Sequence, residues 1–400
     1  MRETWQGYLR QDGRKGIRNV VAVVYLVECA HFVADEITRN FKGQDVHLIG
    51  FPGCFPNDYA QKMMEQLCTH PNVGAVLLVS LGCESFNRAT LAEHIAASGR
   101  PVQTLVIQKS GGSAATIEQG CDFVRSALDQ IDKVARVEMG VSDLIVGTIC
   151  GGSDGTSGIS GNPAAGRAFD QLVAAGAACI FEETGELIGC EHIMAERAVT
   201  PELGQELRQA VAKAAQYYSV LGYGSFAAGN ATGGLSTIEE KSLGAYVKSG
   251  DAPISGIIKP GDVPPRGGLF LMDVIPDGEV RFGFPNISDN AEIVEMIASG
   301  AHMTLFITGR GSVVGSALSP VIKICANPDT YRALAADMDI NAGSIIEGNA
   351  SLDEVAQEIL DAISATASGT PTASEALGHQ EFILTYKSFE PIGPACLPTA

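Results

Sequence analysis

A run of apolar residues at positions 20–26, VVAVVYL, decides the fold class of this chain. Two similar runs follow, VHLIGF at 46–51 and VGAVLLVSL at 73–81, with helical patterns between them at about 31–40 and 58–67. Strands that are apolar at every position are buried on both faces, and the intervening helices provide the cover. The sequence therefore predicts an α/β fold that begins with a doubly wound parallel sheet.

The sequence pattern of the chain changes near residue 140. A strand at 144–147 continues the strand–helix alternation of the first 150 residues, and a glycine- and serine-rich segment, GGSDGTSGISGNP, follows it at 151–163. We therefore expect an N-terminal α/β domain over 1–140. A larger α/β domain with glycine-rich loops is expected over 141–400.

Composition excludes several classes of protein. The 400 residues are 46% hydrophobic and 18% charged, which is unlike a disordered chain. The 27 Lys and Arg against 46 Asp and Glu give a net charge of −19, so a nucleic-acid partner is not expected. No apolar run approaches ~18 residues, and the N-terminus has no secretory pattern. We expect a cytoplasmic protein, with no membrane partner and with its ten cysteines reduced.

Four of the ten cysteines follow predicted strands: Cys29, Cys54, Cys83 and Cys150. In an open parallel sheet, ligands bind beyond the carboxyl ends of the strands. Thiolates that meet there can hold a metal ion or an iron–sulfur cluster. The alternative is that each cysteine serves as a small residue at a tight strand end. The sequence contains no CxxC spacing, so the proximity of the cysteines in sequence does not support a metal site over this alternative.

The glycine-rich loop at 151–158 is a candidate anion site. It precedes a predicted helix, so its backbone N–H groups can face an anion, and it has neither a Walker lysine nor a GxGxxG spacing. A carboxylate substrate suits such a loop, and Ser153 and Asp154 are placed to contact hydroxyls or a cation. The alternative is a helix cap and turn.

Acidic residues and a histidine follow the strand predicted at 178–181. Glu183 comes almost directly after it, and Glu186, Glu191 and His192 lie within the next eleven residues. Carboxylates and an imidazole so close in sequence are typical of cation ligands or of acid and base groups. A solvated acidic helix end would have the same sequence.

Positive charge is scarce, so its positions are informative. Arg18 precedes the first strand, and Arg310 lies in a glycine loop, TGRGS, after an apolar run. An arginine in such a loop suits bidentate capture of a carboxylate. Lys241 follows the segment GNATGG, which contains Asn230, and a partly buried lysine there can act as a base. A surface ion pair is the alternative reading for Lys241.

These segments together resemble the altronate/galactarate dehydratase family. The matching motifs are spread in order along nearly the whole chain: DGR at 12–14 with Gly16 and RN at 18–19, HPNVG at 70–74, LGCE at 81–84, CGGSDG at 150–155 with SG at 157–158, NP at 162–163, ET at 183–184 with Gly189, Glu191 and His192, GN at 229–230 with GGL at 233–235, TIEEKSLG at 237–244, TGRG at 308–311 and MDINAG at 338–343. The resemblance implies a lyase that removes water from aldonates or aldarates to give 2-keto-3-deoxy acids. It also implies dependence on iron or another divalent metal.

Two departures from the family pattern affect what can be transferred. The stretches FPGCFPN at 51–57 and ECAH at 28–31 differ from the usual motifs at strand ends that should line the pocket, so the acid need not be altronate or galactarate. Many relatives also carry a small N-terminal SAF-type domain, whereas this chain starts directly at its first motif. We expect a large-subunit form with a separate small SAF-domain subunit, as in the sulfolactate sulfo-lyases of the same family.

The expected function is that of a metal-dependent dehydratase acting on a sugar acid or a related 2,3-dihydroxy acid. The expected metal is mononuclear Fe2+, an iron–sulfur cluster or another divalent ion. Two alternatives remain, a sulfo-lyase that releases sulfite from a sulfonated hydroxy acid and a non-catalytic sugar-acid-binding subunit. A small anionic substrate and a homo-oligomer are expected. The roles assigned are Cys54, Cys83 and Cys150 for the metal, Lys241, His192 and Glu183 for acid–base catalysis, and Arg310, Ser153, Asp154, Asn230 and Arg18 for substrate binding.

Overall fold

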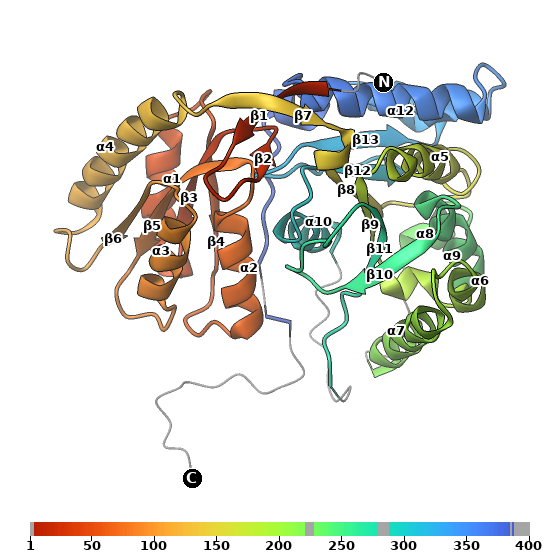
Figure 1. Ribbon diagram of the computed structural model, residues 1–400, viewed down its shortest axis with the longest axis horizontal. Coiled ribbons are helices and arrows are strands. Elements are labelled where there is room, and N and C mark those ends of the chain that lie inside the picture. Colours follow the sequence, from red (N-terminus) through yellow and green to blue (C-terminus); the bar gives the residue numbers. More distant parts are fainter. Residues whose placement is uncertain (1–3, 221–227, 279–287, 385, 388–400) are drawn as a thin grey trace, which may run out of the picture.

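Two parallel sheets lie side by side in the molecule, and a small antiparallel sheet bridges them (Figure 1). The computed structural model describes residues 4–220, 228–278, 288–384, 386 and 387. No helix within those ranges is long and apolar enough to cross a membrane.

The first sheet has four parallel strands in the order β4-β3-β5-β6, which span Val46–Gly50, Val20–Tyr25, Val73–Ser80 and Val102–Val106. Alternate residues of β3 enter different cores, Val21 and Val23 on one face and Val24 on the other. Helices α1 (His31–Arg39) and α4 (Ser113–Ile131) cover the first face. Helices α2 (Asp58–Cys68) and α3 (Arg88–Ala97) cover the second. The predicted doubly covered parallel sheet is confirmed.

The second sheet has seven parallel strands in the order β10-β11-β9-β8-β12-β13-β14. They span Ile254–Ile258, Gly268–Met272, Ala178–Phe181, Ile145–Cys150, Met303–Thr308, Val321–Cys325 and Ile340–Asn341. The strand expected at 144–147 is β8 of this second sheet and pairs with β9 and β12, although it continues the strand–helix alternation of the first 150 residues. An apolar run predicts a buried strand but does not specify its neighbours.

Helices cover both faces of the second sheet as well. The core on one face includes residues of α5 (Gly161–Ala174), α7 (Pro201–Val220) and α12 (Leu352–Ala367), and α10 (Asp289–Ala298) packs on the other. The shorter helices are α6 (Glu191–Glu196), α8 (Ala228–Thr232), α9 (Ile238–Tyr246), α11 (Pro328–Ala333) and α13 (Ala373–Leu377).

The third sheet is antiparallel and joins the two halves. Its order is β2-β1-β7, with bounds Lys15–Gly16, Thr4–Leu9 and Arg136–Gly140, so the start of the chain pairs with the segment that leads into the second sheet. Figure 1 shows β7 passing above the junction.

Buried polar groups cross the seam between the two large sheets. His302 Nε2 lies 2.8 Å from the Lys15 carbonyl oxygen, and its Nδ1 accepts the N–H of Ile145. His70 Nε2 lies 3.2 Å from the Ala301 carbonyl oxygen. One continuous core also includes α2 of the first half and α10 of the second. The two halves therefore form a single packed body.

Arg18 ties the first half to the C-terminal region. Its guanidinium pairs with Glu375 and donates to the carbonyl oxygens of Thr366 and Thr370. Each N–H group of a guanidinium needs an acceptor when it leaves water, and these partners supply several. The position of Arg18 is therefore that of a tether at the start of β3.

Candidate functional site

A buried cluster of charged groups lies at the carboxyl ends of β8 and β9. Cys150 is the last residue of β8, and Glu183 follows β9 by two residues. A single 3-10 turn, Thr184–Leu187, then brings Glu186 back toward the same point. Two lysines close the cluster, Lys241 from α9 and Lys248 from the turn Val247–Ser249.

The groups of this cluster are in direct contact. One ligand atom from each of Cys150, Glu183 and Glu186 lies within 4.8 Å of the others. The Cys150 sulfur is 3.3 Å from Glu186 Oε2 and 3.3 Å from Lys248 Nζ, and its backbone N–H donates to Glu183 Oε2 over 3.0 Å. Lys248 also pairs with Glu183, and Lys241 pairs with Glu186. All five side chains are buried.

Glu183 holds an unusual backbone conformation. Its φ of 78° makes it the sole non-glycine residue with positive φ among the residues that the structure describes. A left-handed conformation costs a residue with a side chain about 1–3 kcal/mol and persists only where the surroundings impose it. Here the conformation accompanies the bond from the Glu183 carboxylate to the backbone of Cys150. Such strain is typical of a functional position.

Burial and neighbouring charge shift the acid–base properties of the cluster. Burial, together with Glu186, raises the pKa of Glu183 to about 8. Burial opposes ionisation of Glu186, but Lys241 and Lys248 outweigh it and hold its pKa below the ordinary value. Burial and the two glutamates raise the pKa of the Cys150 thiol. One carboxylate of the pair therefore ionises more readily than the other.

Further buried acidic side chains lie near the cluster, and the acidic side chains of this region outnumber its lysines. Glu182 is completely buried, and neither of its carboxyl oxygens has a hydrogen-bond partner in the described part of the chain. Burial and nearby carboxylates raise the pKa of Glu182 and of Glu292, and raise that of Asp289 to about 6. The absence of a side chain at Gly151 lets Asp289 approach, because a Cβ there would lie 2.0 Å from Asp289 Oδ2.

The donor set suits a divalent metal ion. A thiol and two carboxylates converge in Cys150, Glu183 and Glu186, and first-row transition metals bind such sulfur and oxygen donors. A bound cation would favour the ionised forms of the neighbouring carboxyls, including that of Glu182, whose pKa burial and like charge raise. The residues present therefore fit a metal, with Cys150, Glu183 and Glu186 as the groups that could hold it.

A cavity of about 230 Å³ adjoins this cluster. Lys241 lines it together with Ser153, Asp154 and Asn162, so one side chain touches both the cavity and Glu186. The Asp154 carboxylate accepts from Thr156 and, over 3.0 Å, from Asn327. Those bonds hold the glycine-rich loop in its shape at the wall of the cavity.

The predicted substrate-binding residues Arg310, Ser153, Asp154 and Asn230 come together near this cavity. Asn230 Nδ2 donates to the Ser153 carbonyl oxygen over 3.3 Å. The Arg310 backbone N–H donates to the Gly152 carbonyl oxygen over 2.9 Å, and its guanidinium donates to the Gly229 carbonyl oxygen over 2.6 Å. The two glycine-rich segments and the TGRGS loop therefore meet at one place.

Other predicted site residues lie apart from the cluster. Cys54 and Cys83 are exposed and follow strands of the first sheet, and the metal-competent group found among the described residues includes neither. The three cysteines assigned to one metal do not come together there. Arg18 forms the tether described above, and His192 is exposed on α6. Their assigned roles stay predictions that the geometry does not support.

Sequence reasoning missed several members of the cluster. Lys248 was not selected, although a lysine directly after the apolar residues 245–247 is a signal of a buried cation. In the sequence, Glu186 is one of several acidic residues after the strand at 178–181, and no local pattern indicates a site role for Asp289 or Glu292. Their separation along the chain gives no local motif, because the fold alone brings α10 to the ends of β8 and β9.

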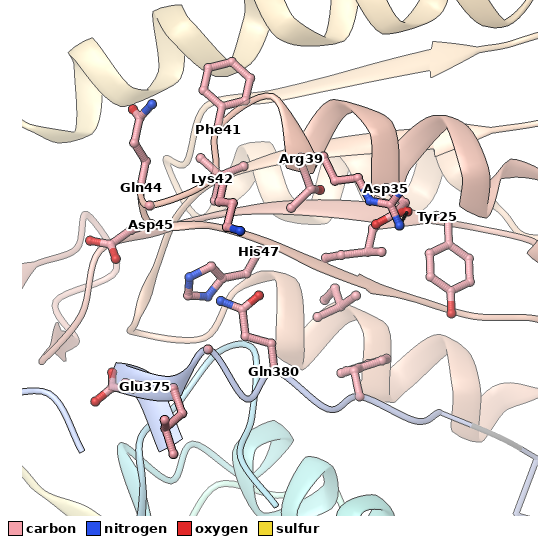
Figure 2. A pocket seen from close by; sticks show the side chains of 18 of the residues that line it. Tyr25, Asp35, Arg39, Phe41, Lys42, Gln44, Asp45, His47, Glu375 and Gln380 are labelled. Atoms are coloured by element: carbon pink, nitrogen blue, oxygen red, sulfur yellow. Dashed lines mark ion pairs between the residues drawn. The ribbon is translucent and has the colours of Figure 1, made fainter. Parts of the chain in front are cut away.

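A larger cavity, of about 1080 Å³, lies along β4, the edge strand of the first sheet (Figure 2). It runs between β4 and the segment 375–382, and the polar side chains of Lys42, His47 and Gln380 point into it. Its lining includes no residue of the Cys150 cluster. The volume of a cavity alone therefore does not identify the candidate functional site.

Comparison with known proteins identifies the family. The family model described as D-galactarate/Altronate dehydratase, C-terminal, matches residues 141–389, and the D-galactarate dehydratase/Altronate hydrolase second-domain model matches residues 7–132. A (2R)-sulfolactate sulfo-lyase subunit beta from Chromohalobacter salexigens is 32% identical over 397 residues, covering 96% of this chain and 97% of that protein.

Longer relatives match over most of this chain. Altronate dehydratase of Bacillus subtilis is 29% identical over 92% of the chain and 74% of its own length. Galactarate dehydratase (L-threo-forming) of Escherichia coli is 29% identical over 92% of the chain and 73% of its own length. The fold, the site and these relatives define the class of protein as a lyase. The chain belongs to the D-galactarate/altronate dehydratase family.

Proposed function

We propose that this lyase is a metal-dependent dehydratase that removes water from a sugar acid or a related 2,3-dihydroxy acid. The product would be a 2-keto-3-deoxy acid. The observation that carries the proposal is the junction of two features, the buried Cys150–Glu183–Glu186 group and the adjoining cavity of about 230 Å³. Lys241 belongs to both.

The reaction has two difficult requirements. The C2–H bond must break although the proton beside a carboxylate is very weakly acidic, and the C3–O bond must break although hydroxide is a poor leaving group. The electron pair of the C2–H bond forms the C2=C3 double bond, the C3 hydroxyl leaves with a proton as water, and the resulting enol becomes the keto acid. A divalent cation would act as a Lewis acid on the substrate's carboxylate and hydroxyl oxygens.

The side chains of this site can move the protons. Lys241 is the titratable nitrogen at the cavity wall. Burial opposes its charged form, but Glu186 and Glu183 outweigh burial and raise the pKa of Lys241, which contradicts the predicted role as a base. We therefore assign Lys241 the donation of a proton to the departing hydroxyl. A positioned acid or base contributes about 10² to 10⁴-fold to a rate. Lys248 and the backbone of Cys150 hold the Glu183 carboxylate in place. Arg310, Ser153 and Asn230 line up the loops that face an anionic substrate.

The donor set favours a single metal ion over a cluster. Iron–sulfur clusters are held mainly by several cysteine thiolates, and the group at this site has one cysteine. Mononuclear Fe2+ is therefore our first choice of metal, with another first-row divalent ion as the second.

A second candidate function is sulfo-elimination. The sulfo-lyase subunit beta named above has nearly the same length as this chain, because the match covers 97% of it. In that reaction sulfite would leave from a sulfonated hydroxy acid in place of water. The net charge of −19 gives either anionic substrate no long-range attraction, so local cations must bind it.

A partner polypeptide is part of the proposal. One relative is named as a subunit, and the match leaves about a quarter of the length of the longer dehydratases uncovered. We propose that a small SAF-type subunit supplies the corresponding part. Assembly of the chain into a homo-oligomer is a further expectation.

One experiment tests the function directly. The chain is purified without oxygen, with and without the candidate small subunit, and its metal content and spectrum are recorded. Aldonates, aldarates and sulfolactate are then supplied, and keto acid and sulfite are measured separately. Keto acid without sulfite supports the dehydratase, and sulfite supports the second candidate. Metal-free protein that forms neither product would contradict both.

A further inference from the structure

Helix α10 carries three acidic side chains at intervals of three residues, Asp289, Glu292 and Glu295. Residues so spaced are neighbours on a helix surface, so the three carboxylates lie close to one another. Asp289 and Glu292 belong to the first turn, where the helix dipole favours negative charge. Glu295 lies in the last turn, where the dipole opposes negative charge, and its side chain has no exposed surface. A carboxylate in that position requires a cation.

The cation comes from the C-terminal segment of the chain. Lys387 Nζ lies 2.7 Å from Glu295 Oε1 and 2.9 Å from Glu295 Oε2, and the lysine side chain is only 6% exposed. The hydroxyl of Tyr59, on α2, donates to the same carboxylate over 2.5 Å. Within the described ranges, Lys387 is the sole cation that forms an ion pair with an acid of α10. The first half, the second half and the end of the chain therefore meet at Glu295.

The residues before Lys387 are packed and hold the lysine in place. Leu384 is 2% exposed and belongs to the core that the two halves share. The Tyr386 ring packs edge-to-face against Phe51, with the ring centroids 5.3 Å apart. The Lys387–Glu295 ion pair, which we call the clasp, therefore fastens α10 to a segment that is itself fixed on the first half.

Close packing at two glycines connects α10 to the candidate site. The helix lies along β8, where a Cβ at Gly147 would be 2.6 Å from the Met296 sulfur, beside the clasp. At the other end of α10, a Cβ at Gly151 would be 2.0 Å from Asp289 Oδ2, and Gly151 directly follows Cys150. The ten residues of α10 span about 15 Å. One rigid element therefore joins the clasp to the end of β8 that carries Cys150.

The Asp289 end of α10 lies within electrostatic reach of the charged cluster. Burial and Glu186 raise the pKa of Asp289, and Lys241 and Lys248 oppose that rise. A displacement of Asp289 would therefore change the field at the two lysines and at Glu186. Protein interiors are close-packed, so a shift at one end of a buried helix is transmitted to the other.

We propose that Lys387 is a positioning residue for the lyase reaction. The clasp sets the place of α10 along β8, and α10 in turn sets Asp289 against the Cys150 end of that strand. The inference rests on the proposed function, because it takes the Cys150 cluster as the reacting site. It adds that the C-terminal segment completes this site from the far end of a helix.

Hydrogen exchange of the metal-free, full-length chain tests the positioning without turnover. In Lys387→Met, the amide exchange rates of α10 and of Gly151 should rise about tenfold or more, while those of α4 stay within twofold. A local structural role would raise exchange around Glu295 alone, and a general loss of stability would raise it in α4 as well. Either result would overturn the proposal.

Kinetics of the metal-loaded enzyme separate position from stability. Lys387→Met should lower kcat about 10- to 100-fold and change KM less than threefold, because small misplacements at a reacting centre are costly. Adding Glu295→Gln removes the unpaired buried charge, so the double variant should recover its thermal stability without recovering kcat. Recovery of kcat together with stability would show a merely structural role.

Two further variants serve as controls. Lys387→Arg keeps the cation and should retain more of kcat than Lys387→Met. Lys62→Met is the matched control, because Lys62 also lies on α2 and pairs across the two halves with Asp262, but both side chains are exposed. Its exchange rates and kcat should equal those of wild type.

The positioning role and the proposed function fail in different ways. Exchange that rises at both ends of α10, with neither keto acid nor sulfite formed by wild type, would support the positioning of α10 by Lys387 and contradict the lyase. Product formation by wild type with an unchanged kcat in Lys387→Met would support the lyase and overturn the role of Lys387.

Discussion

The carboxyl edges of the two parallel sheets carry the same sequence signal and have different structures. Cys54 and Cys83 follow strands of the first sheet, and Cys150 ends a strand of the second; glycine neighbours all three. At the first sheet the cysteines are exposed. At the second, Cys150 is enclosed by two carboxylates and two lysines. A cysteine at a strand end thus becomes a candidate ligand only where other chain segments enclose it.

The difference arises from what covers each edge. Beyond the second sheet, the turn with Glu186, helix α9 and the turn with Lys248 fold over the strand ends and bring charged groups with them. Beyond the first sheet, apolar side chains remain in solvent, with Phe32 61% exposed and Phe55 38% exposed. Desolvation strengthens electrostatic interactions, so the covered edge is where metal binding and proton transfer gain most.

The largest expected effect is the loss of proton transfer at the covered edge. Lys241→Met should lower kcat by about 10² to 10⁴-fold, because a positioned acid or base is removed. Lys241→Arg keeps the charge opposite Glu186 and should retain the fold and metal content. The measurement is keto-acid formation at saturating substrate. A kcat within twofold of wild type in Lys241→Met would remove this residue from the mechanism.

Metal retention contrasts the two edges directly. Cys150→Ser should weaken metal binding by at least about tenfold, since even groups that only orient a ligand contribute 10- to 100-fold. Cys83→Ser and Cys54→Ser, at the exposed edge, should keep full metal content. Metal is quantified after dialysis against a weak chelator. Loss of metal from Cys83→Ser with retention in Cys150→Ser would reverse the comparison, and loss of metal from all three variants would restore the three-cysteine hypothesis.

The seam between the sheets should weaken in acid. Burial lowers the pKa of His302 and of His70 below the ordinary value of 6.5. Below pH 6.5 the unfolded chain binds a proton at each position before the folded protein does. The contribution of these two neutral histidines to the free energy of unfolding is therefore fully present above pH 6.5. It falls by up to about 1.4 kcal/mol per pH unit for each histidine as the pH drops.

Denaturant unfolding of wild type and His302→Gln at pH 7.5, 6.0 and 5.0 measures the contribution of His302 as the difference between the two slopes. The buried carboxyls with raised pKa, Glu183 among them, contribute a slope of opposite sign that is common to both proteins. His302→Gln should be less stable at pH 7.5 and should lose one histidine's share of the slope. Asp12 does not interfere, because its pKa is lowered to about 2 and its contribution is lost only in stronger acid. A slope unchanged in His302→Gln would exclude this histidine as a source.

The smallest expected effect on catalysis is at Arg18, which was predicted to bind substrate. Arg18→Ala should leave KM and kcat within about twofold, because its guanidinium bonds Glu375 and two backbone carbonyl oxygens. Stability should fall by about 1.5–3 kcal/mol, the range for hydrogen bonds to charged groups. Thermal unfolding and a substrate titration on one sample separate the two roles. A tenfold rise in KM without loss of stability would return Arg18 to the site.

Much of the fold was predictable because the strands are apolar throughout. Because the residues of VVAVVYL are apolar on both faces of the strand, Val21 packs into one core and Val24 into the other. The partners of β8 were not predictable, since its run has the same composition whichever sheet it joins. At the candidate site, Cys150 and Glu183 could be selected as candidates because each lies at or just after the end of a strand. Lys248 was missed because it contacts Cys150 across 98 residues of sequence.

The tether from Arg18 to Glu375 also constrains how the chain is made. These partners are 357 residues apart. At about 5–20 residues per second, a ribosome needs roughly 20–70 s to deliver the second after the first. Within that interval, α10 begins at Asp289, 225 residues after Met64 (289 − 64), so for roughly 10–45 s the face of α2 that belongs to the shared core has no α10 to pack against. The nascent chain therefore presents an apolar surface for tens of seconds, and its synthesis should depend on chaperones more strongly than its finished stability would suggest.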